Sequence, residues 1–294
     1  LGIVGVQICI CVPIIVFQFC KGKEFFSKEY WGYALRIGIP IVPHYLSGII
    51  LNQGDRIMID KMVGKTEVAL YGLAYSIGML VQLFISGMNS ALTPWMYSKI
   101  KKGDIRSMRK VLQLLSVVVV GIAVALMLIS PELVLIFGSP KYREAVYVIP
   151  PVAASVFFIF IYNILSMPQF YYEKTQFLMA ASMAAAGANV VLNFIFIRLF
   201  GYIAAGYTTL ACYMLYSVGH YIVSKRILVN EGIQENLMSP GFLVACSVFL
   251  IGASIICNLI FPYRILRYAI LLASAGLVFW KNPKRIREKP PSVS

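Results

Sequence analysis

The sequence predicts an all-α membrane protein, a polytopic bundle of about nine transmembrane helices. Its residues are 60% hydrophobic and only 13% charged, whereas soluble domains carry about 25% charged residues. Apolar segments of roughly the 20 residues that a helix needs to cross the hydrocarbon recur along the whole chain. The connections between them are short and polar, and no Ser-, Gly- or Pro-rich linker marks a domain boundary. One membrane bundle is therefore expected to account for nearly the whole chain.

The expected spans follow one another up to a basic tail. They are residues 1–20, 37–54, 67–97, 111–130, 145–166, 176–197, 203–223, 241–261 and 265–280. Between the first two, residues 21–36 mix aromatic and basic side chains, which is typical of a helix lying in the headgroup layer. An aromatic belt that only anchors the next span explains the same pattern, so both interpretations stay open.

Basic residues concentrate in the connections on one side of the predicted bundle. If the connection after the first span is cytoplasmic, Lys and Arg on that side clearly outnumber those on the other side. The positive-inside rule then places the C-terminus and the tail 281–294 in the cytoplasm. The same bias accounts for the net charge of +14 without nucleic acid, for which no loop has the required length or pattern.

The longest predicted span, residues 67–97, carries a continuous polar stripe. As one helix it would be about 46 Å long at ~1.5 Å per residue, so it must tilt, bend or protrude. Small and polar side chains recur along it at steps of three or four residues, which puts them on one face. They are Tyr71, Tyr75, Gly78, Gln82, Ser86, Asn89 and Thr93.

Three further spans carry a stripe of the same kind. Its members are His44, Gly48 and Asn52 in the second span, Ser182, Ala186, Asn189 and Asn193 in the sixth, and Thr209, Tyr213, Tyr216 and His220 in the seventh. Polar side chains in hydrocarbon cost free energy unless they are paired or hydrated, so the stripes should face the bundle interior. Two interpretations remain, a water-accessible cavity or side chains that only hold the helices together.

No acidic residue is expected in the middle of a span. Those near the spans, at their ends or in connections, are Asp55, Asp60, Glu67, Glu132 and Glu144. A cation-coupled pump usually places a carboxylate near the membrane midplane, so the sequence predicts no coupling site of that kind. The cysteines lie in spans or at their ends without metal-site spacing, and we expect them to be packing residues. No metal or cofactor is therefore expected.

Several short motifs follow one another in a defined order. They are the run from Gly38 to His44, Asn52-Gln-Gly-Asp55-Arg56, Gly72-Leu-Ala-Tyr75, Leu92-Thr-Pro94-Trp95, Phe137-Gly138, Phe170-Tyr-Tyr-Glu-Lys174, Asn189-Val-Val-Leu-Asn193 and Gly201-Tyr-Ile-Ala-Ala-Gly206. In this order and spacing, the motifs resemble the C-terminal portion of the bacterial polysaccharide flippases, the O-antigen or Wzx type. The resemblance covers residues 22–287.

The resemblance implies the two-bundle fold of the multidrug/oligosaccharidyl-lipid/polysaccharide exporter superfamily. Residues 1–20 would be the last helix of a first bundle that is otherwise missing from this chain. Residues 21–36 would form a cytoplasmic interfacial segment and residues 37–223 the second six-helix bundle. Residues 224–280 would add two helices before the tail, all in the bacterial inner membrane.

The activity implied by the resemblance is the flipping of an undecaprenyl-pyrophosphate-linked oligosaccharide across the membrane. Partners would be this lipid-linked substrate, membrane lipids and other membrane proteins of polysaccharide assembly. In a cavity, tyrosines would stack on sugars, amides would bind hydroxyls, and arginines would bind the pyrophosphate. The candidate substrate-binding residues are Arg36, His44, Asn52, Arg56, Tyr71, Tyr75, Gln82, Asn89, Asn189, Asn193 and Tyr213.

Three alternatives belong beside this interpretation. A drug or cation exporter of the same superfamily would need a buried carboxylate, and a lipid II flippase would have an arginine-rich cavity, as the resemblance implies. The spans show neither feature. A membrane-embedded polymerase or glycosyltransferase would need an acid, base or metal site in a sizeable loop, and no such motif is present. The sequence therefore predicts a transporter and not an enzyme.

Overall fold

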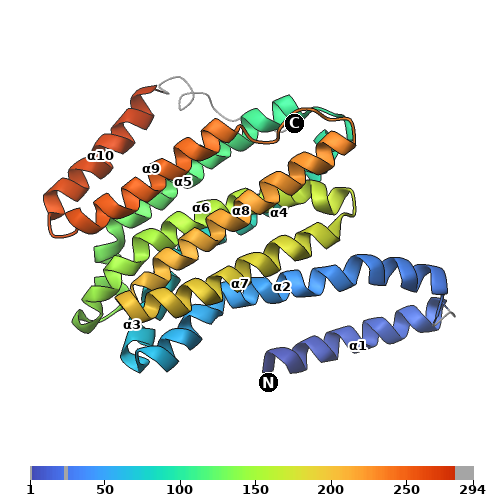
Figure 1. Cartoon of the computed structure of the whole chain (residues 1–294), viewed down its shortest axis with the longest axis horizontal. Helices are drawn as coiled ribbons and strands as arrows, with labels where there is room; N and C mark the ends of the chain where they lie inside the picture. The colour runs from blue at the N-terminus through green and yellow to red at the C-terminus, as the bar shows by residue number, and fades with distance from the viewer. Residues whose placement is uncertain (1, 23–25, 282–294) are drawn as a thin grey trace, which may run out of the picture.

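The structure, a computed structural model, describes residues 2–22 and 26–281, and over these residues all secondary structure is helical. In chain order the helices are α1 (Gly2–Gly22), α2 (Lys28–Met62), α3 (Lys65–Gly78), α4 (Leu80–Lys101), α5 (Ile105–Phe137), the 3-10 helix η1 (Pro140–Val148), α6 (Ile149–Tyr171), α7 (Thr175–Phe200), α8 (Ala204–Asn230), α9 (Pro240–Ile260) and α10 (Arg264–Lys281). Figure 1 shows most of them side by side in one bundle. The predicted all-α class is confirmed.

Seven helical segments in the described ranges are long and apolar enough to cross a membrane. Two of these segments join successive elements, α3 with α4 and η1 with α6. The other two expected spans are also helical and correspond to α8 and α10. The bundle is therefore that of a polytopic helical membrane protein.

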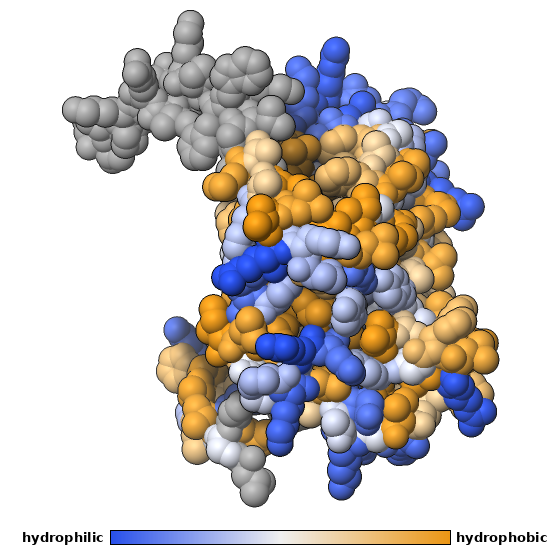
Figure 2. Space-filling view, turned by 90° about the vertical axis from the view of Figure 1, so that its left-hand side faces the viewer, coloured by the Kyte–Doolittle hydropathy of each residue, from blue (hydrophilic) through white to orange (hydrophobic). Residues whose placement is uncertain are grey.

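The connections alternate between the two ends of the bundle. One end, at the right of Figure 1, carries the α1–α2, α4–α5, α6–α7 and α8–α9 connections. The opposite end faces the viewer in Figure 2, where hydrophilic side chains interrupt the apolar surface. Alternation of this kind is what successive membrane crossings require.

α6 is the central helix of the bundle. Nearly all its side chains from Ile149 to Gln169 are buried, and α4, α5, α8 and α9 pack against it. The α6–α8 contact is the most extensive in the molecule, followed by the α2–α7 and α7–α8 contacts. Two helix pairs, α6–α8 and α2–α7, thus frame the interior of the bundle.

Polar residues set some of the helix ends. The Asp104 carboxylate accepts a hydrogen bond from the Ser107 backbone N–H at 3.3 Å and so caps the start of α5. Lys99 Nζ donates to the same carboxylate at 2.5 Å, and this hydrogen bond lowers the pKa of Asp104 below its ordinary value. At the end of α7, Gly201 has a φ of 74°, a left-handed conformation that favours glycine.

The long span predicted over residues 67–97 corresponds to one membrane-crossing segment, Lys65–Lys101, and its helix is interrupted at Met79. α3 ends at Gly78 and α4 begins at Leu80. Gly78 touches α6 so closely that an added Cβ would lie 2.7 Å from Val152 Cγ1. The polar stripe is therefore split into two parts on two helices.

α2 is longer than the span predicted for it. It begins at Lys28 and runs without interruption to Met62, past both ends of the expected range 37–54. The predicted boundary between an interfacial segment and this span, at residues 36 and 37, therefore lies inside a helix. The extension beyond residue 54 carries Asp55 and Arg56 into the interior of the bundle, since α7 packs along α2.

α1 stands apart from the other helices. Each of its side chains that the structure describes is exposed, including those of Val6, Ile10 and Phe17. A helix that is apolar on all sides is typical of a membrane span. Within the described residues, α1 forms no extensive contact with another helix.

Candidate functional site

A cavity of about 760 Å³ opens between α2, α3, α6 and α8. Most of its lining is polar or aromatic. These residues are His44, Tyr45, Asn52, Gln53, Arg56, Tyr75, Ser76, Tyr162, Asn163, Ser166, Phe170, Tyr213 and Tyr216. Gly48, Ile49, Leu51 and Met79 complete the lining, which includes no carboxylate.

Asn52 is the meeting point of three helices in the cavity wall. Its Oδ1 accepts hydrogen bonds from the Tyr75 hydroxyl of α3 at 2.8 Å and from the Tyr213 hydroxyl of α8 at 3.3 Å. Its Nδ2 donates to the Gly48 carbonyl one turn earlier on α2, at 2.7 Å. The amide thus orients two tyrosines at the edge of the cavity.

Stacked aromatic rings form the wall on the side of α6 and α8. The rings of Tyr162 and Tyr213 are nearly parallel, at an interplanar angle of 8° and a centroid distance of 6.3 Å. Tyr162 also lies against Tyr216, with the centroids 4.5 Å apart. The Tyr216 hydroxyl is 3.0 Å from His44 Nδ1, which links this wall to α2. The wall offers flat apolar faces next to hydrogen-bonding edges.

Arg56 supplies the positive charge of the cavity. Its guanidinium lies over the Tyr75 ring, with Cζ 5.3 Å from the ring centroid, a cation–π geometry. Nη1 donates a long 3.4 Å hydrogen bond to Gln53 Oε1, and Nε is buried without a hydrogen-bond partner among the described residues. No salt bridge involves this guanidinium in the described part of the chain. The guanidinium N–H groups of Arg56 can therefore donate hydrogen bonds to a ligand.

Asp55 forms a second polar cluster next to the cavity, and it is fully buried. Its Oδ2 accepts hydrogen bonds from the Tyr71 hydroxyl at 2.5 Å and from the Thr209 hydroxyl at 2.6 Å. Its Oδ1 accepts one from Asn193 Nδ2 at 2.5 Å. Asn193 also bonds to Asn189 and accepts from Thr208. One carboxylate thus joins α2 to α3, α7 and α8 through neutral donors.

The prediction that no carboxylate lies inside the bundle is wrong because of Asp55. The hydropathy of the sequence falls at the consecutive residues Asp55 and Arg56, which suggested the end of a span. α2 in fact continues for seven residues beyond Asp55, to Met62. The spacing contained a usable signal, since Asp55 follows Asn52 by three residues on the same helix face.

The predicted site residues fall into three groups. His44, Asn52, Arg56, Tyr75 and Tyr213 line the cavity together. Tyr71, Asn189 and Asn193 belong to the Asp55 cluster and are sealed from solvent. Arg36, Gln82 and Asn89 lie outside both, so a substrate role for them stays a prediction.

These three outlying residues occupy different surroundings. Arg36 borders a separate hollow of about 360 Å³ with the α6–α7 connection around Glu173. Gln82 and Asn89 are half-buried on α4, and each keeps a buried side-chain oxygen with no hydrogen-bond partner among the described residues. Sequence reasoning missed the α6 contribution to the cavity, Tyr162, Asn163 and Ser166, because the span 145–166 shows no polar stripe.

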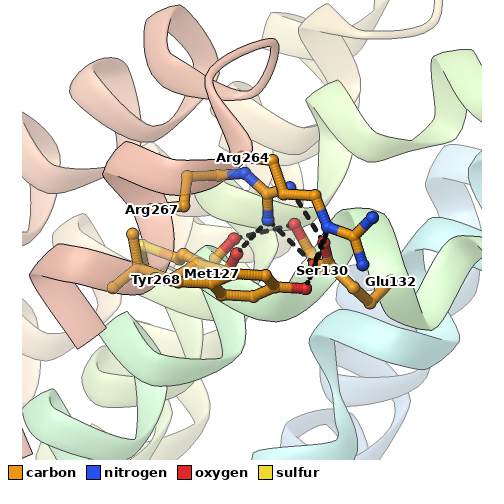
Figure 3. A network of polar contacts seen from close by, with 7 residues as sticks. Met127, Ser130, Glu132, Arg264, Arg267 and Tyr268 are labelled. Atoms are coloured by element: carbon orange, nitrogen blue, oxygen red, sulfur yellow. Dashed lines mark hydrogen bonds and ion pairs between the residues drawn. The ribbon is translucent and has the colours of Figure 1, made fainter. Parts of the chain in front are cut away.

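A third polar cluster, at the far end of the bundle, fastens α10 to α5 (Figure 3). Arg267 donates two hydrogen bonds to the Glu132 carboxylate, at 2.8 and 2.9 Å, and a third to the Leu128 carbonyl at 2.6 Å. The Tyr268 hydroxyl donates to the same carboxylate at 2.9 Å. The Glu132 carboxylate therefore holds α10 against α5.

In the described residues, no group of three His, Cys, Asp or Glu side chains could hold a metal ion.

Comparisons with known proteins agree with this architecture. Residues 4–101 match the profile of a family described as polysaccharide biosynthesis protein. A protein of the Lsg locus of Haemophilus influenzae is 28% identical over 172 residues, which cover 55% of this chain and 41% of that protein. An uncharacterized membrane protein of the same organism is 29% identical over 167 residues, which cover 53% and 40%. No solved structure matches the chain significantly.

The fold and the cavity define a polytopic helical membrane protein with a polar, aromatic chamber. Residues 4–101 are similar to the polysaccharide biosynthesis protein family, and this match supports the resemblance predicted from the motifs. The chain spans about two fifths of the length of the curated relatives it matches.

Proposed function

We propose that this protein contributes to flipping a lipid-linked oligosaccharide across the bacterial inner membrane during surface polysaccharide biosynthesis. The cavity between α2, α3, α6 and α8 is the observation that carries the proposal. An oligosaccharide cannot cross hydrocarbon unaided, because each unpaired polar group costs roughly 2–7 kcal/mol there. A chamber that combines amides, hydroxyls and aromatic faces replaces the lost water contacts.

The chemistry of the lining suits a sugar head group. Amide and hydroxyl groups such as those of Asn52, Gln53 and Asn163 donate and accept hydrogen bonds, as sugar hydroxyls do. The ring faces of Tyr162 and Tyr213 suit the apolar C–H faces of a pyranose. Arg56 is suited to an anionic group, either a phosphate of the linkage or a sugar carboxylate, because its forked donors bind such oxygens in pairs.

The activity needs a path from one leaflet to the other. In alternating access, one helix bundle rocks against another around a central site while the lipid tail stays in the bilayer. The curated relatives are more than twice as long as their matched parts. We therefore assign to this chain one wall of the transport pathway, and the whole activity to the complete protein.

Asp55 favours a second candidate function, export coupled to a cation gradient. Buried carboxylates in membrane helices commonly serve as proton or cation relays. Asp55 is fully buried and meets only neutral donors, so a cation would not compete with a bound Lys or Arg. Collapsing the proton gradient and the sodium gradient separately, in wild type and in Asp55→Asn, tests the coupling. Wild-type export that neither treatment lowers below the untreated level would exclude the coupling.

Asn52→Leu in the complete protein tests the flippase proposal. The change removes the shared acceptor of Tyr75 and Tyr213 and a polar contact with the sugar, so we expect export to fall about tenfold or more. Surface polysaccharide and the leaflet distribution of the lipid-linked oligosaccharide are measured at equal protein level. Val191→Leu, at an exposed position of α7, is the control. Normal export in Asn52→Leu would refute the cavity as the substrate site.

A further inference from the structure

An apolar groove runs along the outside of the bundle between α8 and α9. Both helices pack against α6 but hardly touch each other, so α6 forms the floor between them. Phe157, Phe158 and Ile161 of α6 line this floor, and the groove holds about 170 Å³. Its walls are formed by Met214, Ser217, Val218 and Tyr221 of α8 and by Pro240, Leu243, Val244 and Ser247 of α9.

The groove and the polar cavity lie on opposite faces of the α6–α8 pair. On α8, Tyr213 and Tyr216 line the cavity. Met214 and Ser217, which directly follow them in the sequence, line the groove. The Ser217 hydroxyl donates to the Phe158 carbonyl of α6 at 2.9 Å, which ties the two helices together. The packing of α6 against α8 therefore separates the groove from the polar cavity.

Basic residues lie at the end of the groove near the α8–α9 connection. Lys225 follows Tyr221 by one helical turn, so it continues the α8 face that lines the groove. Lys225 and Arg226 are exposed and border a surface hollow of about 440 Å³ that shares Tyr221 with the groove. Neither side chain forms a salt bridge within the described residues. Glu231, just after the end of α8, is the next charged residue along the chain.

We propose that the groove binds one acyl chain of an anionic phospholipid while Lys225 and Arg226 bind its phosphate headgroup. The α8 wall runs from Met214 to Tyr221, a rise of about 10 Å at ~1.5 Å per residue. This length lies within the ~15 Å of hydrocarbon in a single leaflet. Positive charge at one end and a largely apolar lining along the groove match the two ends of such a lipid. By the positive-inside rule, the leaflet is the cytoplasmic one.

Lipid retention by the purified full chain, measured by native mass spectrometry, tests the site. The probes are phosphatidylglycerol, phosphatidylcholine and undecaprenyl phosphate, each added to the detergent-solubilised protein. Val218→Trp fills the groove and Lys225→Glu/Arg226→Glu reverses the basic end. Val191→Trp, at a similarly exposed site on α7, and Lys141→Glu/Arg143→Glu, at the opposite end of the bundle, are the matched controls.

The wild type should retain phosphatidylglycerol in preference to phosphatidylcholine. Each of the two test variants should lower that retention roughly tenfold, and neither control should change it. Wild-type retention in Val218→Trp would overturn the groove assignment, and wild-type retention in the Lys225/Arg226 variant would overturn the headgroup site. Preferential retention of undecaprenyl phosphate that Val218→Trp abolishes would make the groove a tail site for the transported lipid, and would also overturn the proposal.

Discussion

Replacing Asp55 with leucine should destabilise the bundle, because one carboxylate accepts hydrogen bonds from three different helices. The donors are Tyr71 on α3, Asn193 on α7 and Thr209 on α8. An interhelical hydrogen bond in a membrane is worth roughly 0.6 to 1.7 kcal/mol. Losing all three should therefore lower the free energy of unfolding by about 2 to 5 kcal/mol. Asp55→Asn keeps one acceptor oxygen and should cost less than half of that.

The assay is thermal unfolding of the purified protein in detergent, followed by circular dichroism and repeated in a titration with a denaturing detergent. The expected order of stability is wild type, then Asp55→Asn, then Asp55→Leu. Asp60→Leu serves as the control, because Asp60 is exposed on the same helix and should leave stability unchanged. An Asp55→Leu protein as stable as wild type would refute the burial of this carboxylate between α2, α3, α7 and α8.

Two further changes test the packing of the helices. Glu132→Gln removes the charged partner of the buried Arg267, so unfolding should become easier by about 3 kcal/mol, and limited proteolysis should release α10 first; an unchanged cleavage pattern would contradict this prediction. Gly78→Ala puts a Cβ 2.7 Å from Val152 and should destabilise by about 1–3 kcal/mol, whereas Gly72→Ala, with open space around it, should be neutral or stabilising. Equal effects of the two alanines in thermal unfolding would show that α3 and α6 are not in close contact.

The helical spacing of polar residues predicted much of the cavity. His44 and Asn52 on α2, together with Tyr75 and Tyr213, meet there because residues three or four apart share a helix face. Each polar stripe could be predicted because its residues lie on a single helix. The sequence could not show which stripes meet, and Tyr71, Asn189 and Asn193 in fact assemble around Asp55 instead of facing the cavity.

The features that the sequence did not predict depend on tertiary contacts. The break at Met79 accompanies the contact of Gly78 with α6, which involves residues more than 70 positions away in the chain. Tyr162 and Asn163 were missed because α6 is buried on all sides, and a helix buried on all sides carries no readable amphipathic pattern. Asp55 was misplaced because consecutive charged residues in a sequence look like a membrane boundary. Two of the three residues that donate hydrogen bonds to its carboxylate, Asn193 and Thr209, lie more than 130 positions away in the chain.

The most direct test of a hydrated chamber inside the bundle uses single cysteines in a variant whose native cysteines have been replaced. The measured quantity is the rate at which each cysteine reacts with a charged, water-soluble thiosulfonate. Asn52→Cys places a thiol on the cavity wall, and Val191→Cys places one on the exposed apolar surface of α7. The thiolate is the reactive species and forms only where water reaches it. Rapid modification at position 52 with none at position 191 is the expected result. A thiol at position 52 as inert as the one at position 191 would contradict a hydrated chamber inside the bundle.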